Sequence, residues 1–143
     1  MKSKRVNRYY CEFCKKSGCS AGHIRRHEER CTMNPRRVCG VCKLMEQVQS
    51  PMSLLLEKLP KRGDYPLDNE GGIYGVPVAF LQALDTALPS LRDAAGNCPA
   101  CILATLRQCG AYVPAVDGFN FTKEMKGVWS EFNMARQEDV YYG

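Results

Sequence analysis

The feature that most constrains this chain is a cysteine- and histidine-rich stretch near its N-terminus, residues 9–42. Six of the nine cysteines and both histidines of the 143-residue sequence lie within it. Cys11 and Cys14 form a C-x-x-C pair, His27 follows after twelve residues, and Cys31 follows after three more. Two thiols on a tight turn, followed by two ligands four residues apart on one helix face, satisfy the requirements of tetrahedral zinc. The spacing therefore predicts a zinc site at these four residues.

The same stretch offers other ligand combinations. His23 lies four residues before His27, so the helix face presents both histidines. A site made of Cys11, Cys14, His23 and His27 would close a shorter loop. Cys19 is a further candidate ligand, and the residues alone leave these alternatives open.

Residues 9–31 resemble the Cys-Cys-His-His zinc-finger family, in the variant that ends in a cysteine. Ile24, three residues before His27, stands where the family has a core leucine, and Tyr9 stands where it has an aromatic residue. The chain departs from the family at Gly18, which replaces a core phenylalanine. The resemblance implies a ββα unit.

The register of this resemblance favours one ligand set. The twelve-residue spacer of the family is kept only if His27 and Cys31 are the second pair of ligands. His23 then becomes an exposed helix residue.

The resemblance also implies how the unit would meet DNA. Ser20, His23 and Arg26 occupy the positions that face base edges in zinc fingers. Arg25, Arg26 and Arg30 would supply phosphate contacts or a guanine contact. One finger covers roughly 3 bp, which is too little for high specificity by itself.

A second metal signal comes from two more C-x-x-C pairs. Cys39 and Cys42 form one pair, and Cys98 and Cys101 form the other. Four thiolates make a closed structural zinc site, and helices between the pairs can return the chain to close it. Two zinc ions per chain are therefore expected. The remaining Cys109 lies at the end of an apolar segment and is expected to be a buried thiol.

Charge divides the chain into a basic and an acidic half. Residues 1–62 hold 15 Lys and Arg against 5 Asp and Glu, whereas residues 63–143 hold 5 against 10, giving +10 and −5. A basic, zinc-stabilised half that begins with a basic arm over residues 1–8 is typical of a polyanion-binding protein. Nucleic acid is therefore the expected partner, and the acidic half is the candidate surface for a protein partner.

The predicted fold is small and mostly α-helical. It has three parts: a basic arm over 1–8, a ββα-like finger over 9–35, and a helical body over 36–143 closed by the four-cysteine site. Ser20 is expected to cap the finger helix and Asn34-Pro35 to stop the chain from continuing it. In the body, apolar periodicity and Pro and Gly positions predict helices over 43–49, 51–59, 77–88, 99–109 and 122–138, with loops over 60–75 and 111–120. Pro89 is expected to end the third of these helices or to start a short turn.

The sequence motifs give little support to an enzymatic function. Cys98-Pro-Ala-Cys101 at a helix start resembles a thioredoxin-type redox pair, but the strands of that fold are missing from the pattern. Zinc deaminases and treble-clef nucleases need a histidine placed near the cysteine pairs, and both histidines already belong to the finger.

The sequence as a whole predicts a zinc-binding, non-enzymatic nucleic-acid-binding protein, DNA-binding or regulatory. The alternative is a protein–protein adaptor or virion component in which both zinc sites are purely structural. The plan of the chain is similar to that of uncharacterised small zinc-binding proteins of tailed phages. No secretory signal or membrane-length apolar run is visible, so a cytoplasmic protein (host cytoplasm if viral) without membrane contact is expected.

Overall fold

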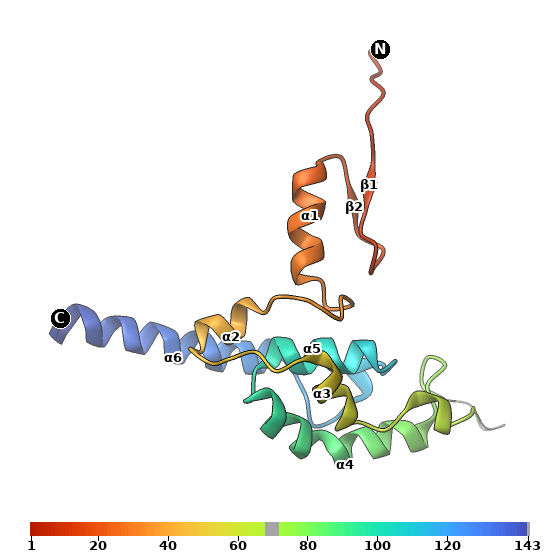
Figure 1. Ribbon diagram of the computed structural model, residues 1–143, viewed down its shortest axis with the longest axis vertical. Helices are drawn as coiled ribbons and strands as arrows, with labels where there is room; N and C mark the ends of the chain where they lie inside the picture. Colours follow the sequence, from red (N-terminus) through yellow and green to blue (C-terminus); the bar gives the residue numbers. More distant parts are fainter. Residues whose placement is uncertain (68–71, 143) are drawn as a thin grey trace.

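A computed structural model of the protein describes residues 1–67 and 72–142, with side chains as far as Arg136 in the last helix (Figure 1). The described part is mostly helical. Residues 68–71 of the predicted loop over 60–75 lie outside it. The elements in chain order are β1 (Tyr9–Tyr10), β2 (Ser17–Gly18), α1 (Ala21–Arg30), α2 (Gly40–Leu44), α3 (Met52–Glu57), the 3-10 helix η1 (Arg62–Asp64), α4 (Val78–Ala95), α5 (Pro99–Gln108), the 3-10 helix η2 (Val113–Ala115) and α6 (Phe121–Tyr142).

The N-terminal unit consists of β1, β2 and α1, and it stands apart from the other helices (Figure 1). The two strands pair antiparallel, Tyr9 opposite Gly18 and Tyr10 opposite Ser17. Ser20 caps α1, because its hydroxyl accepts a hydrogen bond from the backbone N–H of His23 at 3.3 Å. Ile24 is 2% exposed, and its Cδ1 lies 3.6 Å from the position where Gly18 would carry a Cβ. Ile24 therefore packs directly against Gly18, the position at which a larger side chain is absent.

Helix α5 is the centre of the helical body, which comprises α2 to α6. It contacts α2, α3, α4 and α6. All residues from Pro99 to Leu106 are buried, and all but Thr105 are apolar, so this part of α5 is covered on every face. Helix α4 adds Phe80, Leu84 and Leu91, each 0% exposed, to the same core. Cys98 and Cys101 lie at the start of this central helix. A metal ion bound by them would therefore be connected directly to the core of the body.

Helix α4 continues through Pro89, so the prediction that this proline ends the helix is wrong. Pro89 leaves the Asp85 carbonyl without an N–H donor, at a cost of about 3 kcal/mol in a helix interior. The apolar period continues beyond it through Leu91 and Ala95, which are both buried. Burying a large apolar side chain contributes roughly 1.5–3 kcal/mol, so the added contacts offset the proline. The helix ends at Gly96, which has a φ of 61°.

Helix α2 covers Gly40–Leu44, so the predicted helix over 43–49 is shorter and begins earlier. It begins directly at the C-x-x-C pair of Cys39 and Cys42. The side-chain amides of two glutamines after α2 bond to backbone groups elsewhere in the chain. Gln47 donates to the Ala95 carbonyl at 3.1 Å, and Gln49 accepts from the Cys39 backbone N–H at 2.7 Å. These bonds hold the segment against the body.

Helix α6 covers Phe121–Tyr142, and its C-terminal part extends beyond the other helices of the body (Figure 1). An ion pair fixes its first turns, where Arg92 donates to both Glu124 carboxylate oxygens at 2.5 and 3.1 Å. Its predicted apolar face is only partly covered, since Trp129 is 49% exposed. Across the described residues, no helix combines the length and apolar character that a membrane span requires.

Candidate metal centres

The first cluster joins the turn between β1 and β2 to the end of α1. The ligand atoms of its four residues lie within 4.8 Å of one another; the residues are Cys11, Cys14, His27 and Cys31. The turn closes because the Cys11 N–H donates to the Lys16 carbonyl at 2.9 Å. The N–H groups of Phe13 and Lys16 donate to the sulfurs of Cys11 and Cys14, each at 3.4 Å. Two sulfurs on one tight turn can therefore bind one ion.

The two histidines have different environments. His27 is half-buried, and its Nε2 lies 3.2 Å from the Cys14 sulfur. His23 is exposed on α1 and lies outside the cluster, as does the exposed Cys19. The structure thus brings together the set with His27 and Cys31, and Cys31 is 2% exposed at the C-terminal end of α1.

The second cluster lies inside the helical body. Cys39 and Cys98 immediately precede α2 and α5, and Cys42 and Cys101 lie one turn into each helix. All four side chains are 0–3% exposed. The Cys39 and Cys98 sulfurs are 3.5 Å apart, and those of Cys42 and Cys101 are 3.4 Å apart. Four free thiols so close together form a set that could hold a metal ion.

Hydrogen bonds and burial shift the pKa values of three thiols of the four-cysteine cluster in opposite directions. Hydrogen bonds from Cys101 and Cys98 hold the pKa of Cys39 far below the usual thiol range. The hydrogen bond to Cys39 is the first cause that raises the pKa of Cys101, followed by the bond to Cys98 and by burial. For Cys98, the hydrogen bond with Cys101 lowers the pKa, but the bond to Cys39 and burial raise it to about 12.

Metal binding at this cluster is therefore expected to displace protons. At neutral pH the raised pKa values keep the Cys98 and Cys101 thiols protonated, whereas a zinc ligand must be a thiolate. Zinc should release at least these two protons per ion, and its affinity should fall as the pH falls. Calorimetric titration of the metal-free chain in buffers with different ionisation enthalpies measures the number. An apparent binding enthalpy that is the same in every buffer would contradict this expectation.

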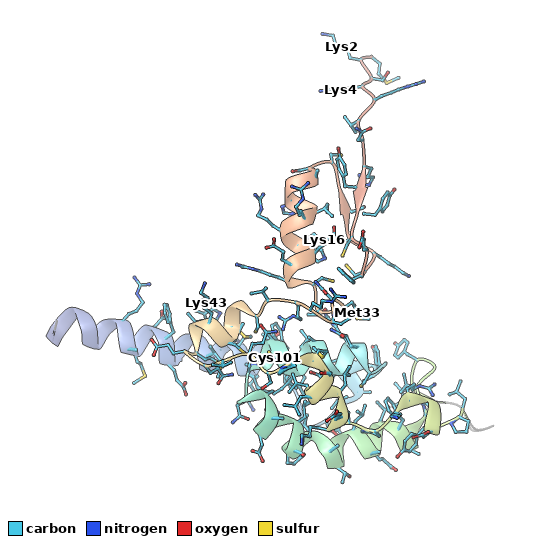
Figure 2. The ribbon with its side chains drawn as sticks, in the orientation of Figure 1. Lys2, Lys4, Lys16, Met33, Lys43 and Cys101 are labelled. Carbon is cyan, nitrogen blue, oxygen red and sulfur yellow. The ribbon has the colours of Figure 1, made fainter. Side chains whose placement is uncertain are left out.

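A hydrogen-bonded linker joins the two clusters. Arg107 and Gln108 at the end of α5 donate to the hydroxyl and carbonyl of Thr32 at 2.9 and 2.8 Å. The backbone N–H of Val38 donates to the Glu29 carbonyl of α1 at 2.8 Å. Met33 lies between the N-terminal unit and Cys101 (Figure 2). These bonds tie the end of α1 and the segment after it to α5.

The residues that the zinc-finger resemblance assigns to DNA contact lie on and before α1. Four of the five are exposed on the helix itself: His23, Arg25, Arg26 and Arg30. Ser20 is also exposed, but its hydroxyl already caps the helix. A shallow cavity of about 430 Å³ lies on this surface, lined by Lys16, His23, Arg26, His27, Glu29 and Arg30. Lys2 and Lys4 lie on the extended arm, farther from the body (Figure 2).

Two residues that sequence reasoning did not single out contact the second cluster. Gln47 Nε2 lies 3.5 Å from the Cys42 sulfur, and Arg37 Nη1 lies 3.7 Å from the Cys101 sulfur. Arg37 is separated from Cys101 by 64 positions, so only the folded chain shows the contact.

Comparisons with protein-family models, with curated proteins and with solved structures find no match to this chain.

Proposed function

We propose that this chain binds two zinc ions and uses its basic N-terminal half to bind nucleic acid, without catalysing a reaction. The observation that carries the zinc part is the closure of two separate four-ligand clusters, one Cys₃His and one Cys₄. Zinc favours thiolate and imidazole ligands in tetrahedral sets of this composition. Four protein ligands leave no open position for a substrate, which is typical of structural zinc.

The nucleic-acid part is supported by charge and exposure. Residues 1–62 carry +10, and the three arginines of α1 are exposed on a helix that the body leaves uncovered. Guanidinium groups pair with phosphate oxygens in a fork-like geometry, and Arg26 stands at a position that reads bases in zinc fingers. The linker bonds to α5 would present this helix in a fixed orientation to the body.

The test is a salt series with the zinc-loaded full chain. Replacing Arg25, Arg26 and Arg30 with alanine should weaken binding at low salt and reduce the log–log salt slope by up to about three for duplex DNA, because each lost phosphate contact contributes about 0.9. The matched control replaces Lys123, Lys126 and Arg136, exposed basic residues of α6 in the acidic half, with alanine. It removes the same three charges and should leave the slope nearly unchanged.

Among the three arginines, Arg26 is expected to affect sequence preference as well as affinity. Arg26→Ala alone should relax any sequence preference by roughly 1–3 kcal/mol, the usual contribution of a guanine contact. A zinc-loaded chain that binds neither duplex nor single-stranded nucleic acid at about 50 mM salt would contradict the nucleic-acid part.

A protein–protein adaptor or virion component is the second candidate, and one surface favours it. Helix α6 leaves Trp129 49% exposed and Met134 61% exposed, and Phe121 is 36% exposed at its start. Exposed aromatic residues are enriched where proteins meet. Binding through this surface would persist at high salt, which separates it from phosphate binding.

The proposal that the chain is not an enzyme rests on its histidines. His27 belongs to the first cluster, and His23 is an exposed residue on α1. General acid–base chemistry would therefore have no free, positioned imidazole in this chain.

A further inference from the structure

Arg37 is an arginine buried beside the four-cysteine cluster. It is 7% exposed, although arginine is rarely buried without a partner. In the described part of the chain no carboxylate forms an ion pair with it. Its Nε has no hydrogen-bond partner among the described residues. Its Nη1 lies 3.7 Å from the Cys101 sulfur. Burying a cation without an anionic partner costs much free energy. The group that can serve as this partner for Arg37 is the cysteine cluster beside it.

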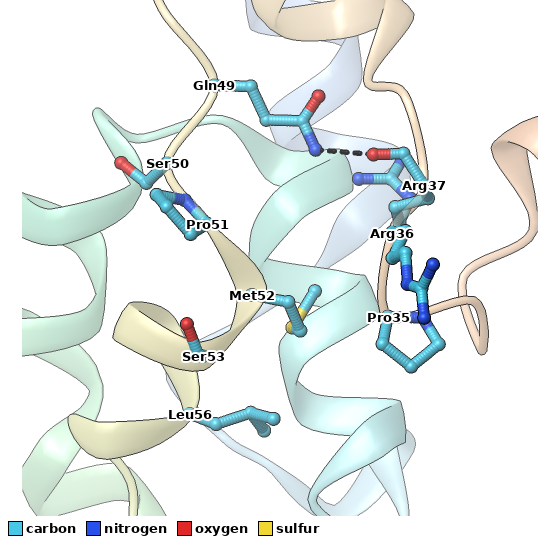
Figure 3. Close-up of a pocket in the computed structure, with 9 residues that line it drawn as sticks. All are labelled: Pro35, Arg36, Arg37, Gln49, Ser50, Pro51, Met52, Ser53 and Leu56. Carbon is cyan, nitrogen blue, oxygen red and sulfur yellow. Dashed lines mark hydrogen bonds between the residues drawn. The ribbon is translucent and has the colours of Figure 1, made fainter.

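The backbone around Arg37 is held in place from two sides. Figure 3 shows one of these contacts, between the Gln49 side chain and the Arg37 carbonyl. Gln49 donates from Nε2 to the Arg37 carbonyl at 2.7 Å and accepts at Oε1 from the Cys39 N–H at 2.7 Å. The Arg37 N–H donates to the Asn34 carbonyl at 3.2 Å. One glutamine amide thus fixes the segment that carries both Arg37 and Cys39.

The charge of an occupied cluster explains why a cation belongs here. Four thiolates around one Zn²⁺ carry a net charge of −2, and all four cysteines are 0–3% exposed. The other side-chain donor to these sulfurs among the described residues is the neutral amide of Gln47. Arg37 donates an N–H to sulfur and also supplies a full positive charge that stays protonated.

We propose that Arg37 is a positioning residue of the four-cysteine zinc centre, which holds the Cys101 thiolate by an N–H···S bond and offsets the charge of the occupied site. The inference rests on the proposed zinc binding. Charge-assisted bonds to a ligand of this kind strengthen metal retention, and loss of an outer-shell partner typically costs 10–100-fold in affinity.

The experiment follows zinc release from the full-length, zinc-loaded chain to an excess of a chromogenic chelator. Arg37→Gln keeps a polar side chain without the charge, and Arg37→Lys keeps the charge without the fork. Arg36→Gln is the matched control, because Arg36 is the adjacent arginine and is exposed. We expect Arg37→Gln to release one of the two ions about 10–100-fold faster than the wild type, Arg37→Lys to fall between them, and Arg36→Gln to match the wild type.

A cobalt-loaded sample supplies a readout that mere loss of packing would not give. The N–H···S bond lowers the energy of the sulfur electrons, so its removal should move the thiolate-to-cobalt charge-transfer band to longer wavelength in Arg37→Gln but not in Arg36→Gln. Circular dichroism checks that each variant remains folded.

The outcomes separate the two proposals. A wild-type chain without an ion in this cluster would overturn the proposed zinc binding and this inference with it. A wild-type chain with two ions, together with an Arg37→Gln variant that releases both at wild-type rates and keeps the charge-transfer band, would overturn this inference alone. Equal acceleration in Arg37→Lys and Arg37→Gln without a band shift would also overturn it, because packing would then explain the effect.

Discussion

Replacing Cys98 with serine is expected to remove one of two zinc ions and to abolish the cooperative unfolding transition of the helical body. Cys98 is 0% exposed and immediately precedes α5, the helix around which the other body helices pack. A structural zinc ion contributes on the order of 10 kcal/mol in small domains. The net stability of a folded domain is only about 5–15 kcal/mol, so loss of the ion removes most of it. Metal analysis and thermal melts followed by circular dichroism measure both effects.

Two cysteines outside the clusters provide the controls. Cys19→Ser changes an exposed thiol and should keep both ions and the wild-type melting temperature. Cys109→Ser changes a half-buried thiol at the end of α5, whose pKa burial raises to about 11, and should keep both ions. A Cys98→Ser protein that retains two ions would show that these four cysteines do not form one site.

The second large effect is expected from His27→Ala, which should remove the other ion and unfold residues 9–31. This unit has a small core, because Ile24 is the only fully buried large side chain that α1 contributes. Its two strands are two residues long each, so little besides the metal would hold the turn against the helix. The ion at the four-cysteine cluster should remain bound. Metal content and proteolysis of residues 9–31 are the measurements.

His23→Ala is the matched control, since it changes the same residue type one turn away on the same helix. His23 is exposed and outside the cluster, so the variant should keep both ions and resist proteolysis like the wild type. The reverse pattern, with metal lost in His23→Ala and kept in His27→Ala, would transfer the ligand role to His23.

The metal clusters were predictable because ligand spacing is a local property on each side of the site. The C-x-x-C pairs place two sulfurs on one turn, and the four-residue step from His27 to Cys31 places two ligands on one helix face. The long-range match of Cys39 and Cys42 with Cys98 and Cys101 followed from the chemistry of zinc, which requires four ligands. The structure brings both sets together.

Other features depended on contacts that the sequence does not display. Pro89 stays within α4 because Leu91 and Ala95 reach the core of the body, and a local rule about proline cannot include that gain. The segment after α2 leaves the helix because Gln47 and Gln49 bond to distant or preceding backbone groups. Arg37 lies beside Cys101 only because the segment after α1 packs against α5 in the folded chain, so no sequence motif predicts this contact.

The central claim, that this chain holds two zinc ions in two separate centres, is tested most directly by the metal content of the intact protein. Native mass spectrometry of the full-length chain under reducing conditions gives the number of ions per molecule. The two closed clusters predict two zinc ions per chain, both lost on treatment with a strong chelator. One ion, or none, in a folded and reduced protein would contradict the claim.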